Sequence, residues 1–257
     1  MRSFRAAARL AGLIAAMAII APAIADVTNP IVTGPIAAKA PPGDPSHDYP
    51  QLATQVDIAS QGYVEEEYFF EGTATRYSTP TLATGGVVST GHPYRTRMIV
   101  RRPTSAERFN GIVVVEWVNV TSGYNLDAMW QASYDLLMRE GYAYVGVSAQ
   151  RVGVQQPPSG LTSWSPARYA GLDVTAGNTV PSDTLSYDIF SQAAQAIRHP
   201  MGVDLRETRS CAADNRRQVR PEAGCTRRFD APASVCLCSN HVSGQVYQAW
   251  RGRSPVR

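Results

Sequence analysis

The hydrophobic pattern of the first 200 residues alternates between the spacing of strands and that of helices. Residues 63–75 are rich in aromatic and β-branched side chains and predict a strand, and 96–102 predict a second one. Residues 111–118 form a nearly continuous apolar run, typical of a strand buried on both faces of a parallel sheet. The Pro-rich segment 30–50, which lies before the first of these strands, predicts irregular structure.

A helix and another strand follow this apolar run. Between residues 125 and 140 the apolar side chains recur at helical spacing and the pattern stops at Gly141, which predicts a helix ended by glycine. The expected buried stripe consists of Met129, Trp130, Ser133, Tyr134, Leu136 and Leu137. Residues 142–148 predict a short buried strand, so strand, helix and strand follow in the order of a right-handed parallel crossover.

The next segment, 150–181, carries prolines and glycines without a sustained period and predicts a functional lid or binding loop. Ser182 then predicts the N-cap of a helix whose apolar face continues to Ile197 and which ends at His199 and Pro200. No strand pattern follows this helix. The fold class indicated is α/β with a mostly parallel sheet, and an apolar strand edge would be left without a neighbour.

The N-terminus has the pattern of a secretory signal peptide. Three arginines precede an uncharged run over residues 10–21, and the small-residue triplet 23–25 predicts cleavage after Ala25. These 12 residues are fewer than the roughly 20 that a membrane span needs. We therefore expect an exported protein, periplasmic or secreted, without a permanent membrane span once the signal peptide is removed.

Charge divides the remaining chain into a body, 26–204, and a tail, 205–257. The whole chain has a formal charge of +3, but the body holds 11 basic and 17 acidic residues, a net charge of −6. The tail holds 10 basic and 4 acidic residues, a net charge of +6. An acidic body argues against nucleic acid and favours a small molecule as the partner.

Three segments of the body carry a resemblance to known proteins: VVVEWVNVTSG at 113–123, EGYAYVGVSAQ at 140–150 and SYDIFSQ at 186–192. Together they resemble a bacterial family of exported α/β-hydrolase domain proteins of the serine-esterase type. The resemblance covers residues 63–204. It implies an α/β-hydrolase fold, a small-molecule acyl substrate, no cofactor, and hydrolysis by a serine nucleophile, a histidine base and an oxyanion hole.

The chain departs from this family after Asp204. The resemblance implies a strand and a nucleophile elbow of the type G-x-S-x-S/G there, and neither follows. The nearest match to the motif surrounds Ser148 but lacks the second glycine, so Ser148 is interpreted as a structural serine at a strand end. No catalytic residue can be identified, and the expected domain is only the N-terminal portion of a hydrolase.

Other titratable residues also have structural interpretations. The four histidines are His47, His92, His199 and His241, and none has an evident nucleophile beside it in the sequence. The run 65–67 of three glutamates is interpreted as a solvated strand edge. Asp127 and Asp188 are interpreted as carboxylates at a helix N-terminus or on an exposed helix face.

One part of a hydrolase site is present in the sequence. The loop after the apolar strand, Asn119, Val120, Thr121, Ser122 and Gly123, is where the resemblance implies one backbone N–H of the oxyanion hole. A strand-to-helix turn without a ligand is the alternative. Residues 119–121 also match a glycosylation sequon.

The tail has a composition of its own. Its 53 residues include 10 Arg, no Lys and all four cysteines, and only 8 are Leu, Ile, Val or Phe. Such a segment is too polar to form a packed core, so we expect disorder. The abrupt change, in a chain with 23 Arg and a single Lys, suggests a shifted reading frame of a GC-rich gene.

Two other interpretations of the tail involve its cysteines, Cys211, Cys225, Cys236 and Cys238. Two disulfides fit an even cysteine count in an exported chain. Zinc binding, with His241, lacks the paired C-x2-C spacing, and no metal site is expected. The sequence thus favours a hydrolase-family protein that is interrupted before its nucleophile and inactive, with a secreted, non-catalytic binding or scaffold protein as the alternative.

Overall fold

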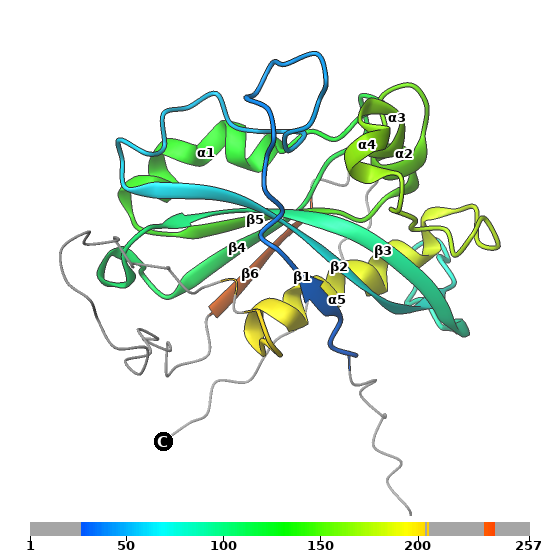
Figure 1. Cartoon of the computed structure of the whole chain (residues 1–257). Coiled ribbons are helices and arrows are strands. Elements are labelled where there is room, and N and C mark those ends of the chain that lie inside the picture. The colour runs from blue at the N-terminus through cyan, green and yellow to red at the C-terminus, as the bar shows by residue number, and fades with distance from the viewer. Residues whose placement is uncertain (1–26, 204, 206–233, 240–257) are drawn as a thin grey trace, which may run out of the picture.

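The computed structural model describes residues 27–203 and 205, and the backbone of 234–239. A six-stranded sheet with the order β1-β2-β3-β5-β4-β6 forms its centre. Helix α1 covers one face of the sheet and α5 the other, and α2, α3 and α4 cluster together beside the sheet (Figure 1). The predicted signal peptide, 1–25, lies outside the described residues.

The strands and helices predicted between residues 63 and 200 occur in the predicted order, and elements that were not predicted lie among them and at both ends. The strands are Ile31–Thr33 (β1), Tyr63–Tyr77 (β2), Val87–Pro103 (β3), Ile112–Trp117 (β4), Ala143–Ser148 (β5) and Ser234–Ser239 (β6). The α-helices are Ala128–Arg139 (α1), Arg151–Gln155 (α2), Leu161–Trp164 (α3), Pro166–Tyr169 (α4) and Ser186–Arg198 (α5). Two short 3-10 helices, Ala106–Arg108 (η1) and Asp183–Leu185 (η2), complete the set.

The α/β fold class is confirmed, but the described sheet is mixed rather than mostly parallel. β4 runs parallel to both β5 and β6, as the predicted crossover through α1 requires. β1–β2, β2–β3 and β3–β5 are antiparallel. For β2 and β3 the physical reason is that residues 63–103 form one long hairpin, whose two strands necessarily pair antiparallel.

Strand β4 has the two-sided burial that its apolar run predicts. Val113 and Val115 pack in the core cluster that also contains residues of α5. Val114 packs on the opposite face with Trp130 and Leu137 of α1. Because successive side chains of a strand point to opposite faces, one apolar run fills both cores.

The buried face of α1 is rotated slightly from the predicted stripe. Trp130, Leu137 and Met138 are buried, whereas Leu136 is 48% exposed. The helix ends as predicted: Gly141 has φ 75°, and a Cβ there would collide with the carbonyl oxygen of Arg108. Glycine is therefore required at this position by both backbone conformation and packing.

Two segments predicted to be irregular contain regular structure. In the Pro-rich lead-in, β1 pairs with β2 in register from Ile31 opposite Glu71. The predicted lid, 150–181, folds into the short helices α2, α3 and α4. Val154, Leu161 and Tyr169 from this segment are fully buried, so its apolar side chains hold it against the body without a periodic pattern.

The tail contributes a strand that its composition does not predict. β6 lies parallel to β4, with Ile112 opposite Ser234 and Trp117 opposite Ser239. The expectation of a tail without structure is therefore wrong for 234–239, and the edge of β4 is paired. The reason is that β4 offers a free row of backbone donors and acceptors, which a strand of almost any composition can satisfy.

Candidate functional site

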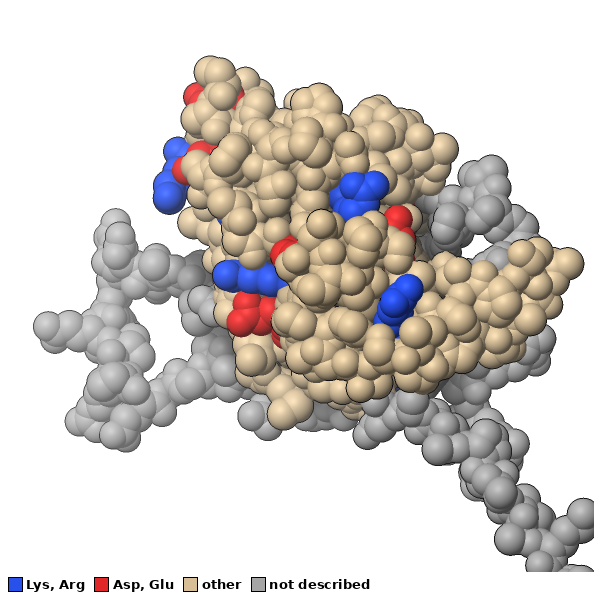
Figure 2. All heavy atoms as spheres, turned by 90° about the vertical axis from the view of Figure 1, so that its right-hand side faces the viewer, with Lys and Arg blue, Asp and Glu red and all other residues tan. Residues whose placement is uncertain are grey.

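The parallel strands end level with one another and define one edge of the sheet. Trp117 of β4 lies opposite Val147 of β5 and Ser239 of β6. Ligands of α/β proteins bind beyond the carboxyl ends of parallel strands, so a ligand site is expected at the loops after β4 and β5. Figure 2 views the side that carries α2, α3 and α4, where the surface is mostly uncharged with a few separate charged groups.

The loop after β4 contains the predicted oxyanion residues and has a defined hydrogen-bond pattern. The Thr121 N–H donates to Asn119 Oδ1 at 2.9 Å, and the Gly123 N–H donates to the Val120 carbonyl at 2.9 Å. Asn119 pairs with Leu126 through both backbone groups. Within the described part of the chain, the N–H groups of Val120 and Ser122 have no hydrogen-bond partner, so both can donate to a ligand.

The segment after β5 holds this loop in place. Ser159 Oγ donates to the Gly123 carbonyl at 2.7 Å, and Asn125 Nδ2 donates to the Gly153 carbonyl at 3.0 Å. A Cβ on Gly153 would collide with the amide of Asn125, so glycine is required for this close approach. The loop is therefore fixed between β4 and α2.

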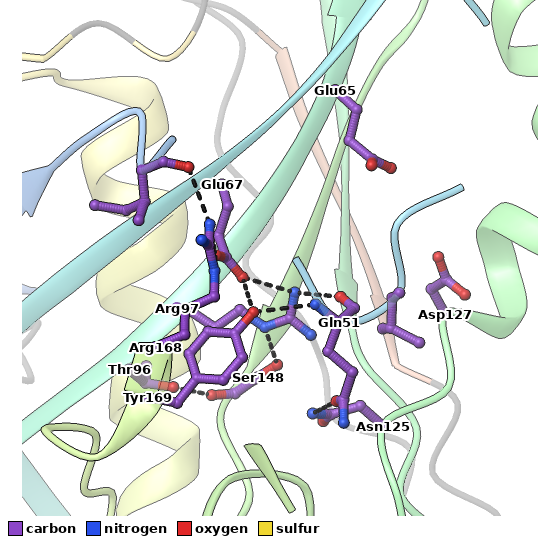
Figure 3. Close-up of polar contacts among 12 residues, drawn as sticks. Gln51, Glu65, Glu67, Thr96, Arg97, Asn125, Asp127, Ser148, Arg168 and Tyr169 are labelled. Carbon is purple, nitrogen blue, oxygen red and sulfur yellow. Dashed lines mark hydrogen bonds and ion pairs between the residues drawn. The ribbon is translucent and has the colours of Figure 1, made fainter. Parts of the chain in front are cut away.

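Ser148 lies at the end of β5 and has a structural environment. It is 1% exposed, its Oγ accepts a hydrogen bond from Arg97 Nε at 3.1 Å, and its carbonyl accepts one from Thr96. Figure 3 shows Ser148 beside the guanidinium of Arg97, with Glu67 on the other side of that group. The hydroxyl is thus engaged by a cation, which agrees with a structural serine.

The run of three glutamates in β2 was predicted to be a solvated strand edge, and this prediction is wrong. Glu67 is buried and accepts hydrogen bonds from Arg97 at 3.3 Å, Arg168 at 2.7 Å and the Tyr169 hydroxyl at 2.7 Å. Each of the other two carboxylates also pairs with an arginine of β3: Glu65 with Arg101 and Glu66 with Arg102. The sequence holds complementary charges on the next strand, Arg97, Arg101 and Arg102, but only the hairpin register shows that Glu65 lies directly opposite Arg101.

The helix-associated aspartates are also more buried than predicted. Asp127 is the N-cap residue of α1 but makes no side-chain cap and instead accepts a hydrogen bond from Arg101 Nη1 at 2.6 Å. Asp188 lies in α5 and accepts the Thr75 N–H at 2.6 Å. An exposed face is thus wrong for Asp188, which joins α5 to the hairpin.

Glu116 supplies the cap that Asp127 does not. Its carboxylate accepts the N–H groups of Met129 at 2.9 Å and Trp130 at 3.3 Å, at the start of α1, and the Tyr144 hydroxyl at 2.6 Å. Burial raises the pKa of Glu116, and these three donors oppose that effect. This carboxylate is used in fixing α1 to the sheet.

The described histidines make contacts in other parts of the fold. His47 stacks on Trp164 with ring centroids 4.3 Å apart, and the His199 carbonyl accepts a hydrogen bond from Asn29. His92 Nε2 lies 2.7 Å from Ser89 Oγ on β3, the one serine–histidine side-chain hydrogen bond in the described part of the chain. His92 has no carboxylate partner there, so the pair lacks the third group of a triad.

Among the described residues, no group of three or more His, Cys, Asp or Glu side chains is placed to hold a metal ion. No helix in the described ranges is long and apolar enough to cross a membrane. His241 and the side chains of the four cysteines lie outside what the structure describes.

Comparison with known proteins supplies a family for this arrangement. A family model described as alpha/beta hydrolase domain matches residues 32–211. The match begins before the resemblance noted at 63–204 and includes most of β1. Searches of curated proteins and of solved structures found no match.

Proposed function

The chain belongs to the alpha/beta hydrolase domain family, and we propose that it is an exported serine-hydrolase relative, inactive because its nucleophile elbow is interrupted. The family membership supports a small-molecule substrate, and an ester or related acyl bond is the specific proposal. Nucleic acid is not a proposed partner, since the body carries a net charge of −6.

The observation that carries this proposal is the loop after β4. It lies at the carboxyl edge of the parallel strands with two backbone N–H groups, those of Val120 and Ser122, available to a carbonyl oxygen. In this family of folds the other oxyanion donor is the N–H after the nucleophile, which follows the strand beyond β4. That position belongs to β6, and the sequence after Ser239 is Asn-His-Val-Ser, without the G-x-S-x-G spacing.

The chemical consequence is binding without efficient turnover. The loop can polarise an acyl carbonyl and favour the tetrahedral oxyanion, but hydrolysis also needs a serine Oγ presented to the carbonyl carbon and a histidine that takes its proton. Sites without their triad keep only about 10³–10⁴-fold acceleration over water. We therefore expect weak ester hydrolysis at most.

An active-site serine probe tests this directly. The full chain is incubated with a fluorophosphonate, the modified peptides are mapped, and hydrolysis of p-nitrophenyl esters is measured in parallel. We expect no stoichiometric labelling. Ser148→Ala and Ser89→Ala serve as controls, because labelling of the wild type that disappears in either variant would overturn the proposal.

The interruption is proposed to arise from a reading-frame change near Asp204. Support comes from the Arg-rich, Lys-free composition of residues 205–257 and from the end of the family match at residue 211, seven residues after Asp204. A gene with the frame restored should encode the strand and elbow. Its product should gain fluorophosphonate labelling that the present chain lacks.

A secreted, non-catalytic binding or scaffold protein is the second candidate. The hydrogen bonds from Ser159 to Gly123 and from Asn125 to Gly153 favour it, because they fix the loop after β4 in a preformed geometry. A short acyl ester or amide that raises the melting temperature without labelling any serine would favour this candidate.

Export is a separate proposal that rests on residues 1–25. It expects the mature chain to begin at Asp26 after cleavage by a signal peptidase. N-terminal sequencing of protein recovered from the periplasm or medium tests it, and an intact Met1 in the recovered protein would contradict it.

A further inference from the structure

The hairpin of β2 and β3 extends into a long uncharged tip. Residues 77–94 contain no Asp, Glu, Lys or Arg. Seven large hydrophobic side chains are exposed in the described chain, and three of them lie in this tip: Leu82 at 86%, Val87 at 60% and Val88 at 53% exposed. Scattered exposed hydrophobic residues are ordinary, but a cluster on an uncharged projection indicates a binding surface.

The geometry of the tip is set by the strand register. Arg76 lies opposite Ser89, Tyr77 lies opposite Val87, and the Ser78 N–H closes the hairpin on the Gly86 carbonyl at 2.9 Å. The loop beyond this bond, 79–85, is almost entirely exposed. At about 3.3 Å for each residue of strand, the Ser78–Gly86 pair lies about 7 Å past Arg76, and the loop 79–85 extends beyond it.

Positive charge marks the base of the projection. Arg76 makes no ion pair within the described residues, and its Nε is buried without a hydrogen-bond partner. Arg95 lies at the other end of the uncharged run, and its partner Glu71 is half exposed. A guanidinium without a carboxylate, placed below an apolar tip, is complementary to a phosphate at the level of lipid headgroups.

We propose that this hairpin docks on the surface of a zwitterionic phospholipid bilayer. Leu82, Val87 and Val88 enter the boundary between headgroups and acyl chains, and Arg76 meets the lipid phosphates. A projection that extends at least about 7 Å past Arg76 can reach the 5–10 Å depth at which interfacial elements lie.

The charge of the tip selects this partner over an anionic membrane. Residues 77–94 carry no Lys or Arg that could attract anionic headgroups, and the net charge of −6 over 26–204 is balanced by the +6 of the tail. A zwitterionic surface requires no such attraction, so apolar insertion and one phosphate contact can suffice for reversible binding. The proposal does not depend on hydrolase activity.

The test is co-flotation of the full chain with vesicles of pure phosphatidylcholine. The triple variant Leu82→Ser, Val87→Ser, Val88→Ser should lose at least tenfold in partitioning. The matched control is Leu136→Ser on α1, also an exposed leucine, which should float like the wild type. Arg76→Gln should weaken flotation less than the triple variant does.

Three results would overturn the proposal. They are absence of wild-type flotation, equal flotation of the triple variant, and binding that requires anionic lipid and disappears with salt, which would point to the basic tail. Light scattering tests whether the tip binds a second copy of the chain instead. A wild-type dimer that is lost in the triple variant, together with no vesicle binding, would assign the tip to a second copy. Urea unfolding midpoints equal to that of the wild type establish that the variants are folded.

Discussion

Replacing Glu67 by glutamine should destabilise the fold far more than replacing a neighbouring glutamate of the same strand. Glu67 is 1% exposed and balances the charge of two buried arginines, Arg97 and Arg168. The substitution keeps the shape but removes the charge. Arg168 retains a second carboxylate, Asp48, at 3.5 Å, whereas Arg97 has no other ion pair in the described residues.

The expected magnitude follows from this burial. Breaking a buried ion pair so that one charge stays uncompensated costs about 3–5 kcal/mol. That is a large share of the 5–15 kcal/mol by which a domain is typically stable. With a urea slope of about 2 kcal/mol/M, the unfolding midpoint should fall by about 1.5–2.5 M.

Equilibrium urea unfolding, followed by tryptophan fluorescence, measures the change. The matched control is Glu71→Gln, whose partner Arg95 is 42% exposed at the side chain, and a surface pair of this kind contributes about 0–1 kcal/mol. If Glu67→Gln shifts the midpoint no more than Glu71→Gln does, then the buried network does not hold the hairpin and the reasoning is refuted.

Three further predictions concern the helices and turns that position the loop after β4. Leu137→Ala should cost about 2–5 kcal/mol in unfolding free energy and Leu136→Ala under about 1, because only the first is buried; equal costs would refute the assigned helix face. Gly141→Ala should lower the melting temperature clearly more than Gly123→Ala, since both have positive φ but only the first would collide with backbone; the reverse order would contradict this packing. Burial raises the folded-state pKa of Glu116, so the folded protein binds this proton more tightly than the unfolded chain and the contribution of Glu116 to stability falls as pH rises through that pKa. Glu116→Gln should therefore be less destabilising at pH 7 than at pH 4 in urea unfolding, and the opposite trend would show that the hydrogen bonds outweigh burial.

Local periodicity was sufficient to predict β4, α1, β5 and α5. The apolar face that was predicted to continue to Ile197 is buried in α5, at Ile189, Phe190 and Ile197 among others, because a helical stripe directly encodes one packed face. The loop 119–123 could also be located, since it must follow a buried strand. The sequence alone could not show which backbone N–H groups of this loop lack a hydrogen-bond partner, because that depends on the turn at Asn119.

The misjudged features depend on residues that meet across the chain. Glu67 looks solvated beside two other glutamates, and only the hairpin register brings it within reach of Arg97. The segment 150–181 lacks a period because its buried residues contact different parts of the body. β6 is a strand through pairing with β4, which its own composition does not reveal.

The central claim is that a hydrolase body is joined, near Asp204, to a segment that does not encode its nucleophile elbow. Resequencing the coding DNA across codons 195–257 and beyond, with translation in all three frames, tests it most directly. We expect another frame to continue from Asp204 into a strand and a G-x-S-x-G or G-x-S-x-S motif. If no frame does so, and peptides from residues 205–257 are found in the natural protein, the interruption is refuted and the binding-protein alternative takes its place.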